Sequence, residues 1–415
     1  MPFILLLIII SGCGDNAIST AVDQSPDKVA CSITYSSGVV EFKNSEMTDL
    51  VKIDSANDIF YFKKTNSKAA QLKAGDIIVI NNYTIRKVTD IVDSSNIRVV
   101  NTEFVTFTEA VKDCDINYDV LFDMSPKTYM KALKNLKGAN IQVNPSNNDF
   151  NFQYKTTDFL YTVSGTFAKG QCTFKVIVDK RIVNTKVASM EVTVVLKSYR
   201  AKGVVRVVDH QLVQYDQQDD LAETEATINF KFAGSGDNIG IELPLDILPP
   251  IPVEGLPFLL FKTKLYVVMN AICPPDGSSI IAARVKYSAS EGLTYHKDTR
   301  DCTPTGTVKT VTYDGDGTPH TASASPISVS WGIGLPRFEI EFLKTTLGSV
   351  MSAYLIGGNY TTFPACQQAI LGFYGSYSWG LGAFGVTIVG GKGPLWKYEK
   401  CLLNVGQCNG GCPPK

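Results

Sequence analysis

Apolar and polar residues alternate along much of the middle of the chain. In residues 172–178 and 190–196 almost every second position is apolar, and the positions between them carry Thr, Lys or Glu. Residues 227–232 and 337–342 repeat the pattern. Successive side chains of a strand point to opposite faces, so each run buries one face and exposes the other. Gly, Asn-Asn and Asp-Gly turn residues separate these runs. The chain is therefore predicted to be mainly β, with antiparallel sheets forming a sandwich or an elongated sheet.

One helix is clearly predicted near residues 125–138. Ser125 is a suitable N-cap, Pro126 fits the first helical position and Gly138 suits the end. An apolar stripe connects them, consisting of Tyr129, Met130, Leu133 and Leu136. A shorter helix is expected to begin near Thr108.

The first residues read as a targeting segment. Residues 3–10 form an unbroken apolar run, which is far shorter than the roughly 20 residues of a transmembrane helix. Ile10-Ser11-Gly12-Cys13 follows directly and resembles the lipobox of bacterial lipoproteins, although no Lys or Arg precedes the apolar run. The resemblance implies cleavage after Gly12 and a diacylglyceryl group on Cys13. With a second, amide-linked acyl chain such as palmitate, that group would anchor the protein stably to a membrane.

Two other interpretations of this segment remain open. It fits an ordinary secretory signal cut near Ser19-Thr20-Ala21, or a buried N-terminal strand. In the first two interpretations the mature protein lies outside the cytoplasm, either anchored at the outer membrane or cell surface or secreted. No later window reaches 18 apolar residues, so no transmembrane helix is predicted in the body of the chain.

These features predict four segments. Residues 1–12 are a signal peptide and 13–27 a polar tether, 28–138 are a small β-rich domain closed by the helix, and 139–415 are a large all-β domain with a disulfide-stapled tail. Within the small domain, a Gly75-Asp76 turn precedes the apolar run 77–80, and Asn81-Asn82 turns into 83–88, which predicts two paired strands.

Nine cysteines follow Cys13, and in an oxidising compartment they are expected to form disulfides. Cys273 and Cys302 flank a Pro-Asp-Gly turn and form a reasonable local pair, although the connectivity as a whole stays open. An odd number leaves at least one thiol free or used between chains. The candidates are Cys31, Cys114, Cys172, Cys273, Cys302, Cys366, Cys401, Cys408 and Cys412.

Two stretches depart from simple alternation and are candidates for ligand contact. Residues 243–261 contain five prolines among apolar residues, which predicts an edge strand or an extended crossing segment. Residues 371–396 interleave glycines with aromatic residues, which is typical of a curved, tightly packed strand pair. Surface aromatics of this kind also suit stacking on sugar rings or holding an acyl chain. The aromatic residues are Phe373, Tyr374, Tyr377, Trp379, Phe384 and Trp396.

Charge and motifs argue against several functions. The chain has 39 Lys+Arg against 40 Asp+Glu and three His, which disfavours nucleic-acid binding and a His-rich metal site, so no metal or cofactor is expected. The Gly-x-Gly-x-x-Gly at 380–385 precedes a strand-like run, not the helix that a dinucleotide site needs. Asp-Gly-Asp-Gly at 314–317 fits a hairpin turn better than a calcium loop.

The resulting hypothesis is a non-catalytic, extracytoplasmic, lipid-anchored β-rich protein. It would bind an apolar or carbohydrate ligand or act as a surface structural element, and its oligomeric state stays open. A first alternative is a secreted polysaccharide hydrolase that uses a carboxylate pair. That pair would come from the acidic run Asp216, Asp219, Asp220, Glu223 and Glu225. A second alternative is a membrane-interacting or adhesive surface protein.

Overall fold

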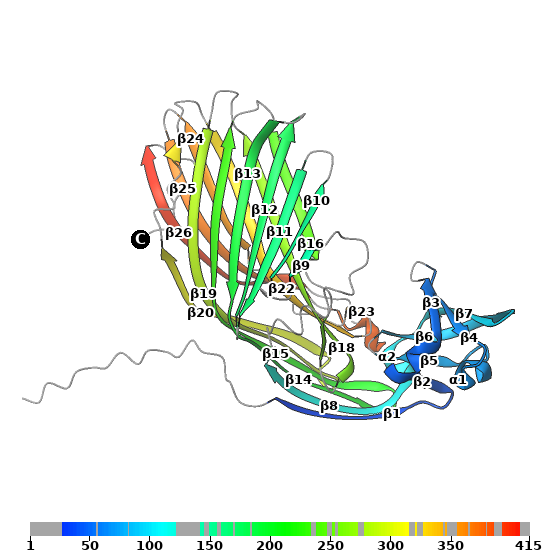
Figure 1. Ribbon diagram of the computed structural model, residues 1–415. Coiled ribbons are helices and arrows are strands. Elements are labelled where there is room, and N and C mark those ends of the chain that lie inside the picture. The colour runs from blue at the N-terminus through cyan, green and yellow to red at the C-terminus, as the bar shows by residue number, and fades with distance from the viewer. Residues whose placement is uncertain are drawn as a thin grey trace, which may run out of the picture.

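The computed structural model describes the backbone of residues 27–406 with gaps. The gaps are 55–56, 82, 122–141, 145–148, 156–158, 169–170, 183–184, 234–237, 247–250, 254–255, 273–277, 315–319, 322–326, 343–344, 347–354, 364–365, 379 and 386–391. Within this part the protein is mainly β, built from two large sheets of long strands and one small six-stranded sheet (Figure 1). The sequence-based prediction of a mainly β protein with large antiparallel sheets is therefore confirmed.

The largest sheet has 12 strands. We call the part formed by β1, β8, β14 and the paired halves of β15 and β19 the base, and the part formed by β9 to β13 and the other halves of β15 and β19 the wall. The order β1-β8-β14-β15-β13-β12-β11-β10-β9 is extended on the other side of β15 by β19, which also pairs with β20 and β21. Their bounds are β1 Lys28–Tyr35, β8 Val111–Leu121, β9 Gln142–Asn144, β10 Asp149–Lys155, β11 Phe159–Ala168, β12 Gln171–Ile182, β13 Thr185–Leu196, β14 Tyr199–Val208, β15 Gln211–Ala233, β19 Ser278–His296, β20 Asp301–Asp314 and β21 His320–Thr321.

Strands β15 and β19 join the base to the wall. Along one edge of β15, residues 211–221 pair with β14 and residues 225–232 pair with β13, while β19 follows the other edge throughout. A register shift between Leu221 and Thr224 separates the two halves, and such an irregularity bends a strand. The base strands accordingly run across the lower part of the molecule as drawn in Figure 1, and the wall strands run upward from them.

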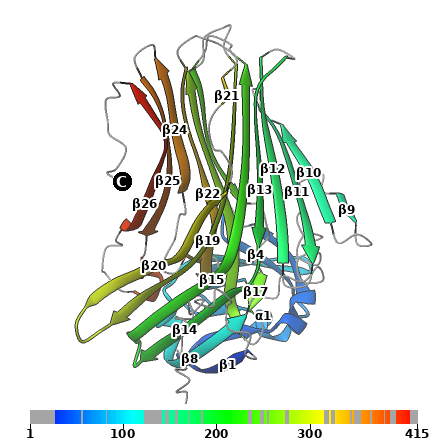
Figure 2. The same ribbon diagram turned by 90° about the vertical axis from the view of Figure 1, so that its left-hand side faces the viewer.

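The second large sheet stands beside the wall (Figure 2). It has eight strands in the order β16-β18-β22-β24-β25-β26, with β17 on β18 and β23 on β22. The bounds are β16 Asn238–Asp246, β17 Ile251–Val253, β18 Leu256–Ile272, β22 Ile327–Phe342, β23 Thr345–Thr346, β24 Leu355–Phe363, β25 Cys366–Ser378 and β26 Lys392–Gly406. Pro244 and Pro252 lie in β16 and β17, at the edge of the sheet, as the proline-rich stretch predicted.

The small sheet is inserted between β1 and β8. It runs β2-β5-β6-β7-β4-β3, with β2 parallel to β5 and every other pair antiparallel. The bounds are β2 Val39–Phe42, β3 Leu50–Asp54, β4 Ile59–Lys63, β5 Ile77–Ile80, β6 Thr84–Ser94 and β7 Ile97–Phe104. Three short helical turns accompany it, η1 Asn44–Asp49, α1 Ser67–Gln71 and α2 Phe107–Ala110, and a fourth, η2 Gly382–Phe384, follows β25.

This arrangement differs from the predicted boundary after Gly138. Strands β1 and β8, which the prediction assigned to the small domain, pair with each other and with β14 in the large sheet. The small unit is therefore a continuous insertion with its own core, formed by Phe42, Phe60, Phe62, Ala69, Leu72, Ile78, Ile80, Val88 and Val100. The predicted helix at 125–138 lies outside the described residues. The predicted pairing of the strands on either side of residues 81–82 is confirmed by β5 and β6.

The alternating apolar and polar residues of the wall strands bury one face of the sheet and expose the other, as predicted. On β12 and β13 the apolar positions are buried and oppose one another in register, with Phe174 opposite Val194 and Val176 opposite Val192. The polar positions between them face solvent, where Lys175 and Glu191 form an ion pair of 2.9 Å. Among the described residues, no helix is long and apolar enough to cross a membrane.

Candidate functional site: a polar groove across the base

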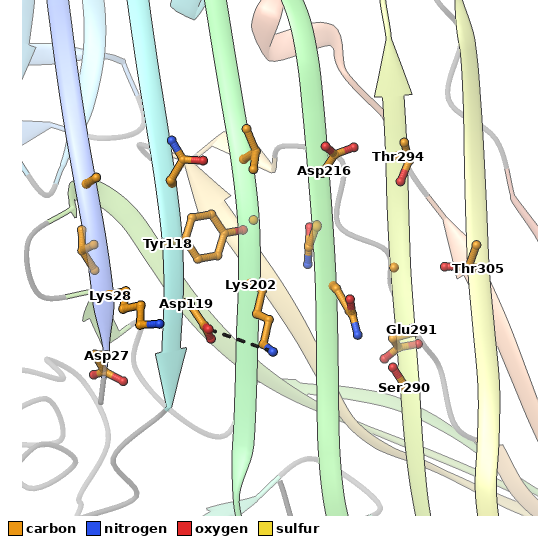
Figure 3. Close-up of a pocket in the computed structure, with 18 of the residues that line it drawn as sticks. Asp27, Lys28, Tyr118, Asp119, Lys202, Asp216, Ser290, Glu291, Thr294 and Thr305 are labelled. Atoms are coloured by element: carbon orange, nitrogen blue, oxygen red, sulfur yellow. Dashed lines mark ion pairs between the residues drawn. The ribbon is translucent and has the colours of Figure 1, made fainter. Parts of the chain in front are cut away.

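A groove of about 890 Å³ crosses the base of the large sheet (Figure 3). Its lining comes from β1, β8, β14, β15, β19 and β20, together with Asp27 just before β1. The volume is within the roughly 300–1,000 Å³ of small-molecule sites. Because one sheet supplies the whole lining, the groove is a trough in a curved surface. Register shifts in β14, β15 and β19 contribute to this curvature.

One row of paired residues forms the floor of the groove. Each of the six residues in this row opposes the next on the neighbouring strand, so the five that have a side chain direct it to one face of the sheet. A second row lies beside it, with Ala30, Asn117, Val204, Asp216 and Thr294. The first row reads Lys28, Asp119, Lys202, Gln218, Gly292 and Thr305.

Gly292 keeps the middle of this floor low. A Cβ atom at this position would lie 2.7 Å from the backbone oxygen of Gln217 and 3.1 Å from Oγ1 of Thr305. Real Cβ atoms do not approach backbone oxygen so closely, so the local bend of β19 requires a residue without a side chain.

The half of the groove on β1, β8 and β14 is charged. Asp119 pairs with the guanidinium of Arg200, which is fully buried, and its other oxygen lies 4.0 Å from Nζ of Lys202. Lys28 stands opposite Asp119 from the other side. Arg200 fixes the carboxylate, while the two lysines reach into the groove. This half therefore presents both acceptors and donors.

The half on β15, β19 and β20 carries hydroxyl and amide groups. Asp216 and Glu291 are the carboxyl residues of the lining here, and Asp216 accepts a hydrogen bond from Nε2 of Gln214. Nε2 of His296 lies 3.9 Å from Asp216. The remaining polar side chains are uncharged, namely Gln218, Ser290, Thr294, Thr305 and Thr307.

The opposite face of the same strands is packed and carries a buried polar layer. The hydroxyl of Tyr215 donates to Oε1 of Gln217 at 2.7 Å, and Nε2 of Gln217 donates to Oδ2 of Asp219 at 2.7 Å. Burial raises the pKa of Asp219 to about 7, and the hydrogen bonds from Gln217 and Tyr199 oppose this effect. Glu291, directly across from Asp219 on β19, is buried with it and also borders the groove. This layer supports the groove from beneath but does not open into it through Asp219, which is 2% exposed.

Phe384 is part of the covering of that packed face. Its ring packs edge-on against Phe107, at 5.6 Å between centroids, and against Tyr215 at 5.9 Å. The hydroxyl of Thr108 donates to the Phe384 carbonyl at 2.8 Å, which holds η2 beside α2. Phe384 is 2% exposed, so it has a packing role in place of the predicted ligand contact. The glycines around it form a short turn, not a phosphate-binding loop.

The other predicted aromatic residues do not line the groove. Trp396 on β26 lies over Gly375 on β25, where a Cβ would be 2.3 Å from the indole ring, which fits the predicted close packing of this strand pair. Phe373, Tyr374 and Tyr377 lie on β25, but their side chains are outside the described part of the chain. Trp379 and the lipidation candidate Cys13 are also outside it.

The described cysteine side chains carry free thiols instead of the predicted disulfides. These are Cys31, Cys114, Cys172 and Cys302, so the proposed bond between Cys273 and Cys302 is not present. Burial raises the pKa of the Cys114 and Cys302 thiols to about 12, which keeps them protonated and unreactive at neutral pH. The backbones of Cys366 and Cys401 are described without their side chains, and Cys273, Cys408 and Cys412 are outside the described residues.

The acidic run lies along β15 and is divided between its two faces. Asp216 lines the groove, Asp219 is on the packed face, and Glu225 pairs with Arg284 and Lys286 further along. These carboxylates are therefore not gathered at one centre.

Asp314 ends β20, and the predicted turn after it lies outside the described residues. In the described part of the chain, no group of three or more His, Cys, Asp or Glu side chains could hold a metal ion.

The groove was not predicted from the sequence. Its floor joins residues from Lys28 to Thr305, and only pairing between distant strands brings them together. The available signal was the polar half of alternating strands, which also marks any exposed sheet face. Gly292 within a strand was a more specific sign, because a strand glycine often marks a bend or a close approach.

No protein-family model, curated protein or solved structure matches this chain.

Proposed function

We propose that this chain is a non-catalytic binding protein whose base groove holds a carbohydrate chain. The observation that carries the proposal is the row of polar side chains along the 890 Å³ groove, which combines hydroxyl, amide, carboxylate and ammonium groups. Sugar hydroxyls both donate and accept hydrogen bonds, and this mixed set offers partners of both kinds. Of the two ligand classes that the sequence suggested, the groove favours carbohydrate, since Ala30 and Val204 are the aliphatic side chains that the register places on the groove face.

The charge of the groove further narrows the ligand. Four acidic residues line the groove, Asp27, Asp119, Asp216 and Glu291, against the two lysines Lys28 and Lys202, so the lining has no excess of positive charge. A groove for nucleic acid or another polyanion would need clustered positive charge. The lining therefore suits a neutral or weakly charged glycan.

A carboxylate-based hydrolase is the second candidate, because Asp219 combines a pKa near 7 with a second carboxyl group opposite it on β19. The packed position of Asp219 disfavours this candidate, since a catalytic acid must reach the glycosidic oxygen. Asp219→Asn is expected to leave glycan binding intact. Release of reducing ends from a bound polysaccharide by the parent protein, lost in Asp219→Asn, would favour the hydrolase instead.

We also propose that the protein lies outside the cytoplasm. This proposal rests only on the apolar N-terminal segment and Cys13. Cys13→Ser should move the protein from the membrane fraction to the soluble fraction of its host. If the variant fractionates like the parent, lipidation at Cys13 is wrong, while the groove proposal stands untouched.

Glycan-array binding tests the groove. Asn117→Ala/Gln218→Ala removes two amides from neighbouring rows of the floor, and Asn229→Ala removes one from the same face of β15 beyond the groove. We expect the double variant to bind its glycans at least about tenfold more weakly, the effect of losing about 1.4 kcal/mol of hydrogen bonding, with Asn229→Ala unchanged. Equal binding by all three proteins, or no glycan bound by the parent, would overturn the proposal.

A further inference from the structure

Strand β1 is an exposed edge of the large sheet. Among the described strands it pairs only with β8, and residues Lys28–Ser32 are all exposed. Exposed edge strands present unpaired N–H and C=O groups to solvent, and proteins normally protect them with proline, charge, irregularity or short length. Eight-residue β1 contains no proline and one charged residue, and its register shift comes only at the end, between Thr34 and Tyr35.

The other edges of the two large sheets are protected in these ways. β9, at the far end of the 12-stranded sheet, has three residues. β20 contains Pro304, β16 contains Pro244, and β26 contains Pro394 and register shifts against β25. β1 is therefore an exception among these edges, which indicates that another strand covers it.

The sequence of β1 is self-complementary in antiparallel pairing. If two copies meet with Cys31 opposite Cys31, Val29 of one copy opposes Ile33 of the other twice, and such β-branched pairs stabilise a sheet. These residues share a face with Ile116 and Cys114, so the pairing would extend an apolar row. On the other face Lys28 would oppose Thr34 of the second copy, whose own partner on β8 is Asp113. This places a positive charge near a carboxylate.

We infer that β1 is a homodimer interface in which two copies of this chain join their large sheets edge to edge around a twofold axis at Cys31. The occupant of the edge is a second copy because the strand is complementary to itself at its apolar positions and its lysine would approach Asp113 on β8 of the second copy. A twofold interface of this kind is closed, so the dimer does not grow into a filament. If the proposed function holds, both grooves face the same side, and one long glycan would bind both with increased avidity.

Sedimentation of the full chain carrying Cys13→Ser, which removes any lipid, tests the dimer. Val29→Lys/Ile33→Lys would set lysines opposite lysines across the seam, whereas Val92→Lys changes a half-exposed valine in the small unit. We expect the dimer dissociation constant to rise at least about tenfold in the double variant and to stay unchanged in Val92→Lys. A monomer at every concentration, or a dimer that the double variant leaves intact, would overturn the inference.

Directed cross-linking tests the same dimer without the lysine variants, so its result does not depend on whether those variants fold. With oxidised glutathione as the oxidant, two Cys31 thiols would give one disulfide and two reduced glutathiones. In a Cys31→Ser background, a mixture of Val29→Cys and Ile33→Cys chains should cross-link between the two variants, and peptide mass mapping identifies the bond. Absence of both the Cys31 bond and the mixed bond would exclude the register. Neither outcome depends on glycan binding, so failure here is distinct from failure of the proposed function.

Discussion

Asp219 on β15 stands directly opposite Glu291 on β19, and both side chains are buried. Two like charges in directly opposed positions destabilise a sheet. Burial raises the pKa of Asp219 to about 7, so this carboxyl group keeps its proton under mildly acidic conditions. The burial of Asp219 therefore links the stability of the base to pH.

The stability of the protein should therefore decrease as pH rises from about 4 to about 7. An unfolded aspartate loses its proton near pH 3.9, while folded Asp219 keeps it to about 7, so the folded state binds more protons in this window. The contribution of this group to the free energy of unfolding is full below the window and falls by up to about 1.4 kcal/mol per pH unit. Asp219→Asn should remove that slope in thermal unfolding at several pH values, and exposed Asp90→Asn should keep it. Parallel curves for Asp219→Asn and the parent would contradict the assignment.

Gly203→Ala should destabilise the base. A Cβ at Gly203 would lie 2.3 Å from Cζ of Tyr118, whose ring is buried and cannot move aside without displacing its neighbours. Overpacking of this kind costs about 1–3 kcal/mol, which urea unfolding can measure. Gly380→Ala is the control, because nothing lies within 4 Å of its added atom. The cost should shrink in a Tyr118→Leu background; an unchanged cost there would mean that the ring is not its cause.

Loss of the carboxylate at Asp119 should cost more than loss of its partner. Asp119→Asn leaves the fully buried guanidinium of Arg200 without this counter-charge, at a cost of about 3 kcal/mol or more. Arg200→Met replaces the buried cation with an apolar side chain and should cost less. Urea unfolding of both single variants and the double variant checks the order. A larger loss in Arg200→Met would show that the other contacts of Arg200 dominate.

Phe384→Ala should weaken the fold without changing glycan binding. The variant leaves a cavity between Phe107 and Tyr215, which typically costs about 3–5 kcal/mol. Phe104→Ala, at a half-exposed phenylalanine in the small unit, should cost far less in the same thermal unfolding assay. Weaker binding by correctly folded Phe384→Ala, with unchanged stability, would restore this residue as a ligand contact.

Local patterns predicted the strands but not their partners. Val176 and Val192 were expected on buried faces because alternation reports only which side of a strand is apolar. The pairing of Lys28 with Asp119 was not predictable, because a 75-residue unit separates β1 from β8 and nothing in either strand specifies the other. The groove depends on five such pairings, and its polar residues look like any solvated face. Phe384 shows the reverse error, since an aromatic residue among glycines fits packing as well as ligand contact.

Filling the groove tests the central claim most directly. Gln218→Trp places a large side chain on the floor beside Gly292, while Asn229→Trp places the same side chain on the same face of β15 beyond the groove. Titration of a glycan selected by the parent protein should give a dissociation constant at least about 100-fold weaker for Gln218→Trp, which corresponds to about 2.7 kcal/mol, and an unchanged constant for Asn229→Trp. Parent-like affinity in folded Gln218→Trp would show that the glycan binds elsewhere.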